Sequence, residues 1–187
     1  MAREYCVAIV GATGVVGGTV RAILEERGFP VGELRLLASA RSAGRRLDFA
    51  GVKHEVQELG TGSFAGVDLA FFAAGGDISR EYVHTAVAAG ATVIDKSSVF
   101  RQHPLVPLVV PEVNADHLAA HRGVIATPNC STIQMVVALR PLHDAARIQR
   151  IVVSTYQAVS GSGHRGVADL ETQVREWAAG DEVHQSF

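Results

Sequence analysis

The stretch that decides the fold is Tyr5-Cys-Val-Ala-Ile-Val-Gly-Ala-Thr-Gly-Val-Val-Gly17. Its first six residues are an apolar run, and apolar residues at helical spacing follow the last glycine. Gly11 permits a tight turn, Gly14 lets the backbone approach a pyrophosphate, and Gly17 allows a helix to pack closely on a strand. Glycines also serve ordinary turns, but a strand before them and a helix after them predict a dinucleotide site at the helix N-terminus.

The end of the next predicted strand, residues 33–38, indicates which dinucleotide binds. It is followed by Ser39-Ala-Arg-Ser42, with no acidic residue where an NAD enzyme usually binds the ribose hydroxyls. Arg41 can hold a 2′-phosphate bidentately, while Ser39 and Ser42 donate to its other oxygens. This pattern favours NADP over NAD; the alternative is a solvated basic loop.

A candidate nucleophile lies in Ala126-Thr-Pro-Asn-Cys-Ser-Thr132. Cys130 follows a predicted strand (124–126) and precedes a helical pattern (133–142), so it falls in the first turn of a helix. Unpaired N–H groups and the helix dipole favour the thiolate there. The alternative for Cys130 is a small buried residue at a strand-to-helix joint. Cys6, inside the first strand, is predicted to be a core residue.

The rest of the chain alternates apolar runs with helical patterns. Strands are predicted near 68–74, 92–94, 108–110 and 124–126, and helices near 79–89 and 115–121. This alternation predicts an α/β fold with a doubly wound, mainly parallel Rossmann-type sheet. The β-rich run 150–159 predicts a long strand that opens a second, α+β domain, followed by a helix at 167–178.

Composition restricts the function classes. The chain has 187 residues, a formal net charge of −2 and 48% hydrophobic residues, so it can bury a core and nucleic acid is not an expected partner. No apolar run reaches membrane length, and the two cysteines have neither metal nor disulfide spacing. A soluble, cytoplasmic protein without a metal is expected.

Six motifs in this order resemble aspartate-semialdehyde dehydrogenase over nearly the whole chain. They are GATGVVG at 11–17, SARSAG at 39–44, SSVFR at 97–101, PLVVPEVN at 107–114, PNCST at 128–132 and YQAVSG at 156–161. The resemblance implies a cofactor domain at residues 1–129 and the beginning of a catalytic and dimerisation domain at 130–187.

The resemblance also implies residue roles. Cys130 is the nucleophile and Gln157 orients the acyl group, while Ser98, Arg101 and Asn129 bind the substrate and its phosphate. The residues implied to bind NADP are Gly11, Thr13, Gly14, Val15, Val16, Gly17, Ser39, Arg41, Ser42, Ala74, Gly75, Ser160 and Gly161.

The implied reaction is reduction of L-4-aspartyl phosphate to L-aspartate 4-semialdehyde and phosphate, through a Cys130 thioester, in the biosynthesis of lysine, threonine and methionine. A homodimer or homotetramer is implied.

Two features depart from the family. Lys96 stands where many members carry Asn, and members continue past Phe187 with a catalytic His and a carboxylate-binding Arg. The chain therefore resembles the N-terminal part of the enzyme. N-acetyl-γ-glutamyl-phosphate reductase and a non-catalytic NADP-binding or dimerisation module remain alternatives.

Overall fold

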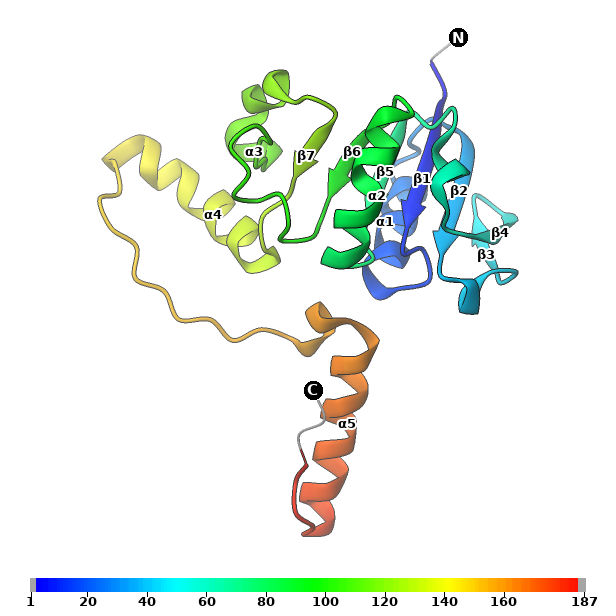
Figure 1. The fold of residues 1–187 in the computed structure, drawn as a ribbon. Coiled ribbons are helices and arrows are strands. Elements are labelled where there is room, and N and C mark those ends of the chain that lie inside the picture. The colour runs from blue at the N-terminus through cyan, green and yellow to red at the C-terminus, as the bar shows by residue number, and fades with distance from the viewer. Residues whose placement is uncertain (1–2, 185–187) are drawn as a thin grey trace. The chain divides into compact units, whose positions relative to one another are not determined.

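The structure, a computed structural model, describes residues 3–184 and divides into two compact units, Met1–Arg147 and Ile148–Phe187. The first unit holds a seven-stranded sheet in the order β3-β4-β2-β1-β5-β6-β7 (Figure 1). The strands are β1 Tyr5–Val10, β2 Val31–Ala38, β3 Arg46–Phe49, β4 Val52–Glu58, β5 Leu69–Phe72, β6 Thr92–Asp95 and β7 Val124–Ala126.

The strand order is that of a dinucleotide-binding fold. The chain begins at β1, moves outward through β2 to β4, and then crosses back to place β5, β6 and β7 on the other side of β1. Every neighbouring pair is parallel except β3 with β4. Without β3 the order is 3-2-1-4-5-6, which reverses between β1 and β5. The predicted doubly wound, mainly parallel sheet is confirmed.

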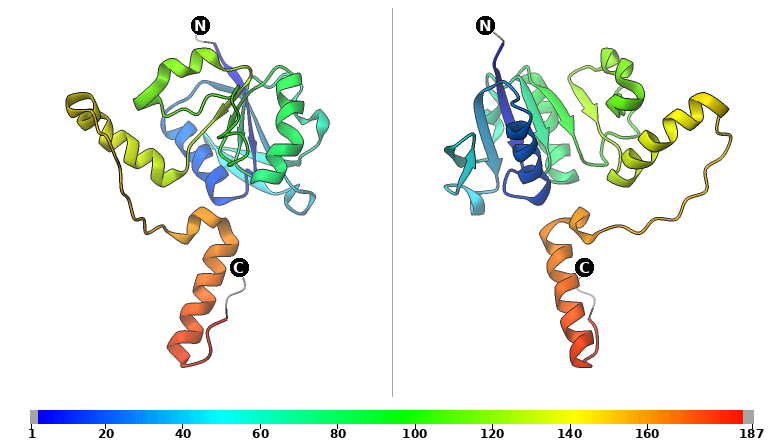
Figure 2. Two further views of the ribbon diagram at one scale, coloured as in Figure 1. Left: turned by 60° about the vertical axis from the view of Figure 1, so that its left-hand side comes forward. Right: turned by 180° about the vertical axis from the view of Figure 1, so that it is seen from behind.

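Helices cover both faces of this sheet. The helices of the first unit are α1 Val15–Glu26, α2 Gly76–Ala88, α3 Pro111–Asn114 and α4 Cys130–Ala146, with 3-10 helices η1 Ala40–Ser42, η2 Thr61–Phe64 and η3 Ala115–Ala120, and of these α1 and α2 cover the two faces. Figures 1 and 2 show α1 and α2 on opposite faces of the sheet. Phe72 and Val83 belong to the core on the α2 side, and Ile9 and Leu24 to the core on the α1 side. Because β1 is buried on both faces, its sequence is a continuous apolar run.

Some local predictions need correction. The helix expected near 115–121 is the 3-10 helix η3, and of the run 108–110 only Leu108 makes an isolated bridge, to Ala126. The hairpin of β3 and β4 was not predicted at all. β3 is the edge strand and β4 is its neighbour, and both carry many charged and exposed residues, so neither presents the continuous apolar run of a central strand.

The second unit consists of an extended segment, the 3-10 helix η4 (Val159–Ser162) and α5 (Gly163–Ala179). The helix predicted at 167–178 is confirmed. The strand predicted at 150–159 is wrong: among the described residues no strand forms a ladder with it, and Val152 and Tyr156 are exposed. An extended backbone becomes a strand only when a neighbour takes up its N–H and C=O groups.

Helix α4 belongs to the first unit, where Arg140 donates to the carbonyl of Val113 in α3. The domain boundary expected between residues 129 and 130 stays a prediction.

In residues 3–184, no helix has the length and apolar character needed to cross a lipid bilayer.

Candidate functional site

The candidate site is the edge of the sheet where the parallel strands end. Strands β1, β2, β5, β6 and β7 run in the same direction, so the loops that follow them meet at their carboxyl ends. These loops, with the helix starts they lead into, carry all the predicted site residues of the first unit. They are 11–17 after β1, 39–42 after β2, 74–75 after β5, 98–101 after β6 and 129–130 after β7.

The turn between β1 and α1 requires glycine for steric reasons. Gly11 has φ +85°, and a Cβ there would lie 2.8 Å from the Ala73 carbonyl oxygen. A Cβ on Gly17 would lie 2.2 Å from the Gly11 oxygen. The backbone N–H groups of Gly11 and Ala12 donate to the Leu37 carbonyl at 2.8 and 3.1 Å. The turn is therefore packed against the ends of β2 and β5, and the first turn of α1 begins there.

This glycine turn fits a dinucleotide. Thr13 lies within it, Gly14 is the N-cap residue of α1, and Val15 and Val16 begin the helix. The N–H groups of a first helical turn have no acceptor within the helix, and they point along the positive end of its dipole. Such a helix start is suited to the pyrophosphate of a nucleotide cofactor.

The segment after β2 forms the 3-10 helix η1, with Ser39 as its N-cap. The Ser42 N–H donates to the Ser39 carbonyl at 2.8 Å, which brings the two serines to one short turn. Arg41 lies between them and is exposed. Its guanidinium has no ion-pair partner among the described residues, so it is available to an anion.

The turn after β5 is held close to β1. The Ala73 N–H donates to the Val10 carbonyl at 2.9 Å, and Gly75, the N-cap of α2, has φ +96°. A left-handed conformation of this kind favours glycine. Ala74 and Gly75 thus lie beside the end of β1, and their cofactor role stays a prediction.

Arg101 joins two of the loops at this edge. Its Nε donates to the Thr127 carbonyl at 2.9 Å and its Nη2 donates to the Lys96 carbonyl at 3.1 Å. The guanidinium is half-buried and therefore fixed between the loop after β6 and the loop after β7. Ser98, in the first of these loops, is exposed.

Cys130 is the first residue of α4, and its side chain is exposed. Asn129 is the N-cap: its Oδ1 accepts from the Ser131 N–H at 3.0 Å and from the Ser131 hydroxyl at 2.7 Å. The amide oxygen of Asn129 thus caps the first turn of α4, and its NH₂ group is the side chain's hydrogen-bond donor.

The other cysteine has a different environment. Cys6 lies within β1 and is half-buried, and burial raises the pKa of its thiol. Its backbone N–H donates to the Asp68 carboxylate at 2.9 Å. Cys6 therefore has the character of a structural residue, whereas Cys130 is accessible at a helix start.

Three predicted site residues lie in the second unit. Gln157 belongs to the extended segment, and Ser160 and Gly161 to η4. Their predicted roles stay predictions.

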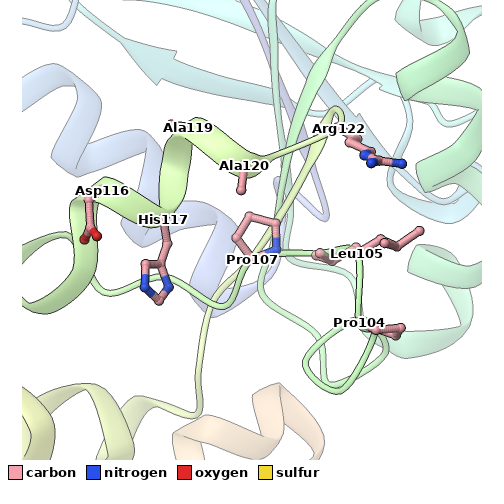
Figure 3. Close-up of a pocket in the computed structure, with 9 residues that line it drawn as sticks. Pro104, Leu105, Pro107, Asp116, His117, Ala119, Ala120 and Arg122 are labelled. Carbon is pink, nitrogen blue, oxygen red and sulfur yellow. The ribbon is translucent and has the colours of Figure 1, made fainter.

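Two cavities lie away from the strand ends. One, of about 700 Å³, lies between residues 104–107 and η3 and includes Asp116, His117 and Arg122 (Figure 3). None of the predicted site residues lines it. The other, of about 320 Å³, lies beside α1 and is lined in part by Lys96. Lys96 therefore contributes its carbonyl to Arg101 while its side chain lies on the α1 side.

Sequence reasoning missed Asp95, Ser97 and Thr127, which connect the loops after β6 and β7, and Ser79, which joins Asp95 to α2. Asp95 is fully buried, and it alternates with Ile94 so that it shares a face with Val93. An acidic residue at a buried position in a strand was the available signal.

Comparison with known proteins identifies two matching protein families. A family profile described as semialdehyde dehydrogenase, NAD binding domain, matches residues 6–121, and one described as semialdehyde dehydrogenase, dimerisation domain, matches residues 139–187. The chain is 53% identical over 182 residues to an aspartate-semialdehyde dehydrogenase of Aquifex aeolicus, covering 96% of this chain and 54% of that protein. It is 50% identical over 175 residues to the Bacillus subtilis protein of the same name, covering 94% and 51%.

Solved structures of aspartate semialdehyde dehydrogenases are also similar to this chain. The crystal structure of aspartate semialdehyde dehydrogenase II from Vibrio cholerae, described as complexed with ASA, superposes with a TM-score of 0.93 at 46% identity, covering 98% of this chain and 55% of that one. An aspartate semialdehyde dehydrogenase from Candida albicans, described as containing NADP, has a TM-score of 0.65 at 27% identity and covers 77% and 48%. The chain spans about half the length of these relatives.

Proposed function

Because this chain belongs to the semialdehyde dehydrogenase family, we propose that it carries the NADP site and the nucleophile of an aspartate-semialdehyde dehydrogenase. The observation that carries the proposal is the placement of Cys130. Its exposed thiol begins α4 at the same sheet edge as the glycine turn of α1. A nucleophile and a dinucleotide cradle at one edge are what a cofactor-dependent reduction of an acyl group requires.

The proposed substrate is L-4-aspartyl phosphate. Arg101 is suited to its phosphate because its guanidinium is already held by two backbone carbonyls and Nη1 makes no bond to a described residue. Ser98 is exposed in the same loop, and the Asn129 amide can donate from the start of α4. A substrate anion would thus be bound next to the nucleophile.

In the proposed reaction the Cys130 thiolate attacks the acyl carbon, the carbon–oxygen bond to phosphate breaks, and inorganic phosphate leaves with the bonding electrons. This gives a thioester. The cofactor, NADPH, supplies the hydride that reduces it. Collapse of the resulting hemithioacetal oxyanion then re-forms the carbonyl, breaks the carbon–sulfur bond and expels the Cys130 thiolate, which gives L-aspartate 4-semialdehyde. Asn129 and the start of α4 would stabilise the tetrahedral oxyanions, at roughly 3 kcal/mol per well-placed donor. Gln157 is proposed to orient the acyl group.

The proposed cofactor is NADP. The glycine turn holds the pyrophosphate, and Ser39, Arg41 and Ser42 hold the 2′-phosphate. Ala74, Gly75, Ser160 and Gly161 are proposed as further cofactor contacts. The exposed Arg41 supports this choice, because a charge-assisted contact is worth about 1.5 to 3 kcal/mol, or about tenfold in affinity or more.

The biological setting is proposed from the relatives. The reaction belongs to the biosynthesis of lysine, threonine and methionine, in the cytoplasm. The match of residues 139–187 to a dimerisation domain supports a homodimer or homotetramer of the whole enzyme. N-acetyl-γ-glutamyl-phosphate reductase chemistry and a non-catalytic NADP-binding module are the competing functions, and substrate choice and turnover separate them.

The test joins this chain to the C-terminal half of the Aquifex aeolicus relative and assays phosphate-dependent oxidation of L-aspartate 4-semialdehyde with NADP⁺. We expect turnover that Cys130→Ser lowers by on the order of 10³-fold or more, because the nucleophile is lost. Cys6→Ser is the matched control and should keep its activity. Turnover that survives Cys130→Ser would refute the proposed mechanism, and exclusive use of the N-acetyl-γ-glutamyl substrate would refute the proposed specificity.

The cofactor is tested by calorimetry on the chain itself. NADP⁺ should bind at least about tenfold more tightly than NAD⁺, and Arg41→Ala should abolish the preference. Arg46→Ala, in the edge strand β3, removes an equal charge nearby and should leave the preference intact. Equal losses in the two variants would mean that general basic charge, not a 2′-phosphate site, sets the affinity.

A further inference from the structure

Asp95 is a carboxylate buried without a cation. It ends β6, is fully buried, and forms no ion pair with any residue in 3–184. Its partners are neutral: the Ser79 hydroxyl at 2.7 Å and the Ser97 N–H at 3.2 Å on Oδ1, and the Ser97 hydroxyl at 2.6 Å on Oδ2. Burial of a charged group is unfavourable unless the group is well hydrogen-bonded. The buried Asp95 carboxylate is therefore expected to have a structural or functional role.

The carboxylate fixes the start of the loop that carries Ser98 and Arg101. A carboxylate only accepts, so the Ser97 hydroxyl must donate to it. The oxygen of that hydroxyl then accepts from the Val99 N–H at 3.2 Å. Asp95 thus orders Ser97 through its backbone and its side chain together, and Ser97 orders the next turn.

The same loop is tied to the residues before Cys130. The Asp95 carbonyl accepts from the Thr127 N–H at 2.9 Å and from the Thr127 hydroxyl at 3.2 Å. The Thr127 carbonyl accepts from Arg101 Nε at 2.9 Å. Together with the backbone from Ser97 to Arg101, these hydrogen bonds close a ring that returns through Thr127 to Asp95. Thr127 lies three residues before Cys130.

We propose that Asp95 is a positioning residue that holds the Arg101 loop, through Ser97, in register with the strand-to-helix segment bearing Cys130. This inference rests on the proposed function, because it assumes that Arg101 binds the phosphate of the acyl group that Cys130 attacks. Ser79 ties the same carboxylate to α2 and has no part in the loop. Variants of these two serines therefore distinguish a positioning role of Asp95 from the simple burial of its polar side chain.

The first experiment measures hydrogen–deuterium exchange by mass spectrometry on the 187-residue chain. Ser97→Ala and Asp95→Asn should speed exchange about fivefold or more in residues 96–101 and also in 127–132, as expected for the loss of one hydrogen bond. Ser79→Ala removes a donor of the same kind and should speed exchange in α2 only. Equal effects of the two serine variants, or a Ser97→Ala effect confined to 96–101, would overturn the proposal.

The second experiment uses the chimeric enzyme described above. Ser97→Ala should raise KM for inorganic phosphate about fivefold with KM for NADP⁺ within twofold of the parent, and Ser79→Ala should leave both constants unchanged. An active chimera in which Ser97→Ala leaves KM for phosphate unchanged would also overturn the role of Asp95. A chimera without turnover would count against the proposed function alone, because exchange on the chain is measured without catalysis and still decides whether Asp95 couples the two loops.

Discussion

The sheet of the first unit and the extended segment of the second are both rich in β-branched residues, yet only one forms strands. In β1 the side chains of Val7 to Val10 are fully buried, because β2 and β5 pair with both of its edges and helices cover its faces. In residues 151–158, Val152 is 83% exposed and Tyr156 is fully exposed. Local sequence sets the tendency to be extended, but neighbouring strands and burial decide whether a strand forms.

The largest difference between these regions is expected in proteolysis. Chymotrypsin should cleave after Tyr156 at least about 10³-fold faster than after Phe72, because cleavage in β5 requires opening of the buried sheet. Timed digestion with mass spectrometry gives both rates. Resistance at Tyr156 would mean that the segment is covered in solution, and size-exclusion chromatography would then test whether a second copy covers it.

The next difference concerns single aromatic side chains. Phe72 is 1% exposed and stacks on Phe64 with ring centroids 5.8 Å apart, whereas Trp177 in α5 is 76% exposed. Phe72→Ala should lower the free energy of unfolding by about 3 to 5 kcal/mol, and Trp177→Ala should change it by no more than about 0.5 kcal/mol. Urea unfolding must be followed by circular dichroism, because Trp177 is the one tryptophan in the sequence. A large effect of Trp177→Ala would show that α5 is packed in solution.

The same contrast explains what the sequence could predict about the fold. Strands β1, β5 and β6 were predicted because burial on both faces leaves an apolar run, and α1 and α5 because their apolar residues recur at helical spacing. The pair β3 and β4 was missed because most of its residues are exposed and many are charged, so neither strand is an apolar run. The run 150–159 was wrongly predicted as a strand because composition carries no information about partners.

The candidate site divides in a similar way. The segments with Gly11, Arg41 and Cys130 could be recognised from the sequence because each directly follows a predicted strand, whereas Ser98 and Arg101 are implied only by the family resemblance. The Asp95 network could not be predicted. Its donors come from α2, from the loop after β6 and from the segment after β7, and only the fold brings these together.

The smallest expected effect depends on pH and tests how the first unit anchors its strands. Asp68, before β5, accepts from the Cys6 N–H at 2.9 Å and from Arg3 at 2.8 Å. The hydrogen bond from the Cys6 backbone, followed by the hydrogen bond and the charge of Arg3, holds the pKa of Asp68 below its usual range. A carboxyl with a lowered pKa in the folded state stabilises that state above its unfolded pKa of about 3.9, and this contribution is lost as the pH falls through the folded value.

Asp68→Asn should therefore destabilise the first unit slightly at pH 7, and the difference from the parent chain should shrink as the pH is lowered through 4 towards 3. Urea midpoints at pH 7, 5, 4 and 3 measure it. Glu176→Gln is the matched control, because Glu176 also accepts a backbone N–H, that of His184 at 2.9 Å, but in the second unit. This control should leave the unfolding midpoint of the sheet unchanged at every pH. A difference at Asp68 that stays constant with pH would mean that hydrogen-bond geometry, and not the charge of the carboxylate, ties β1 to the start of β5.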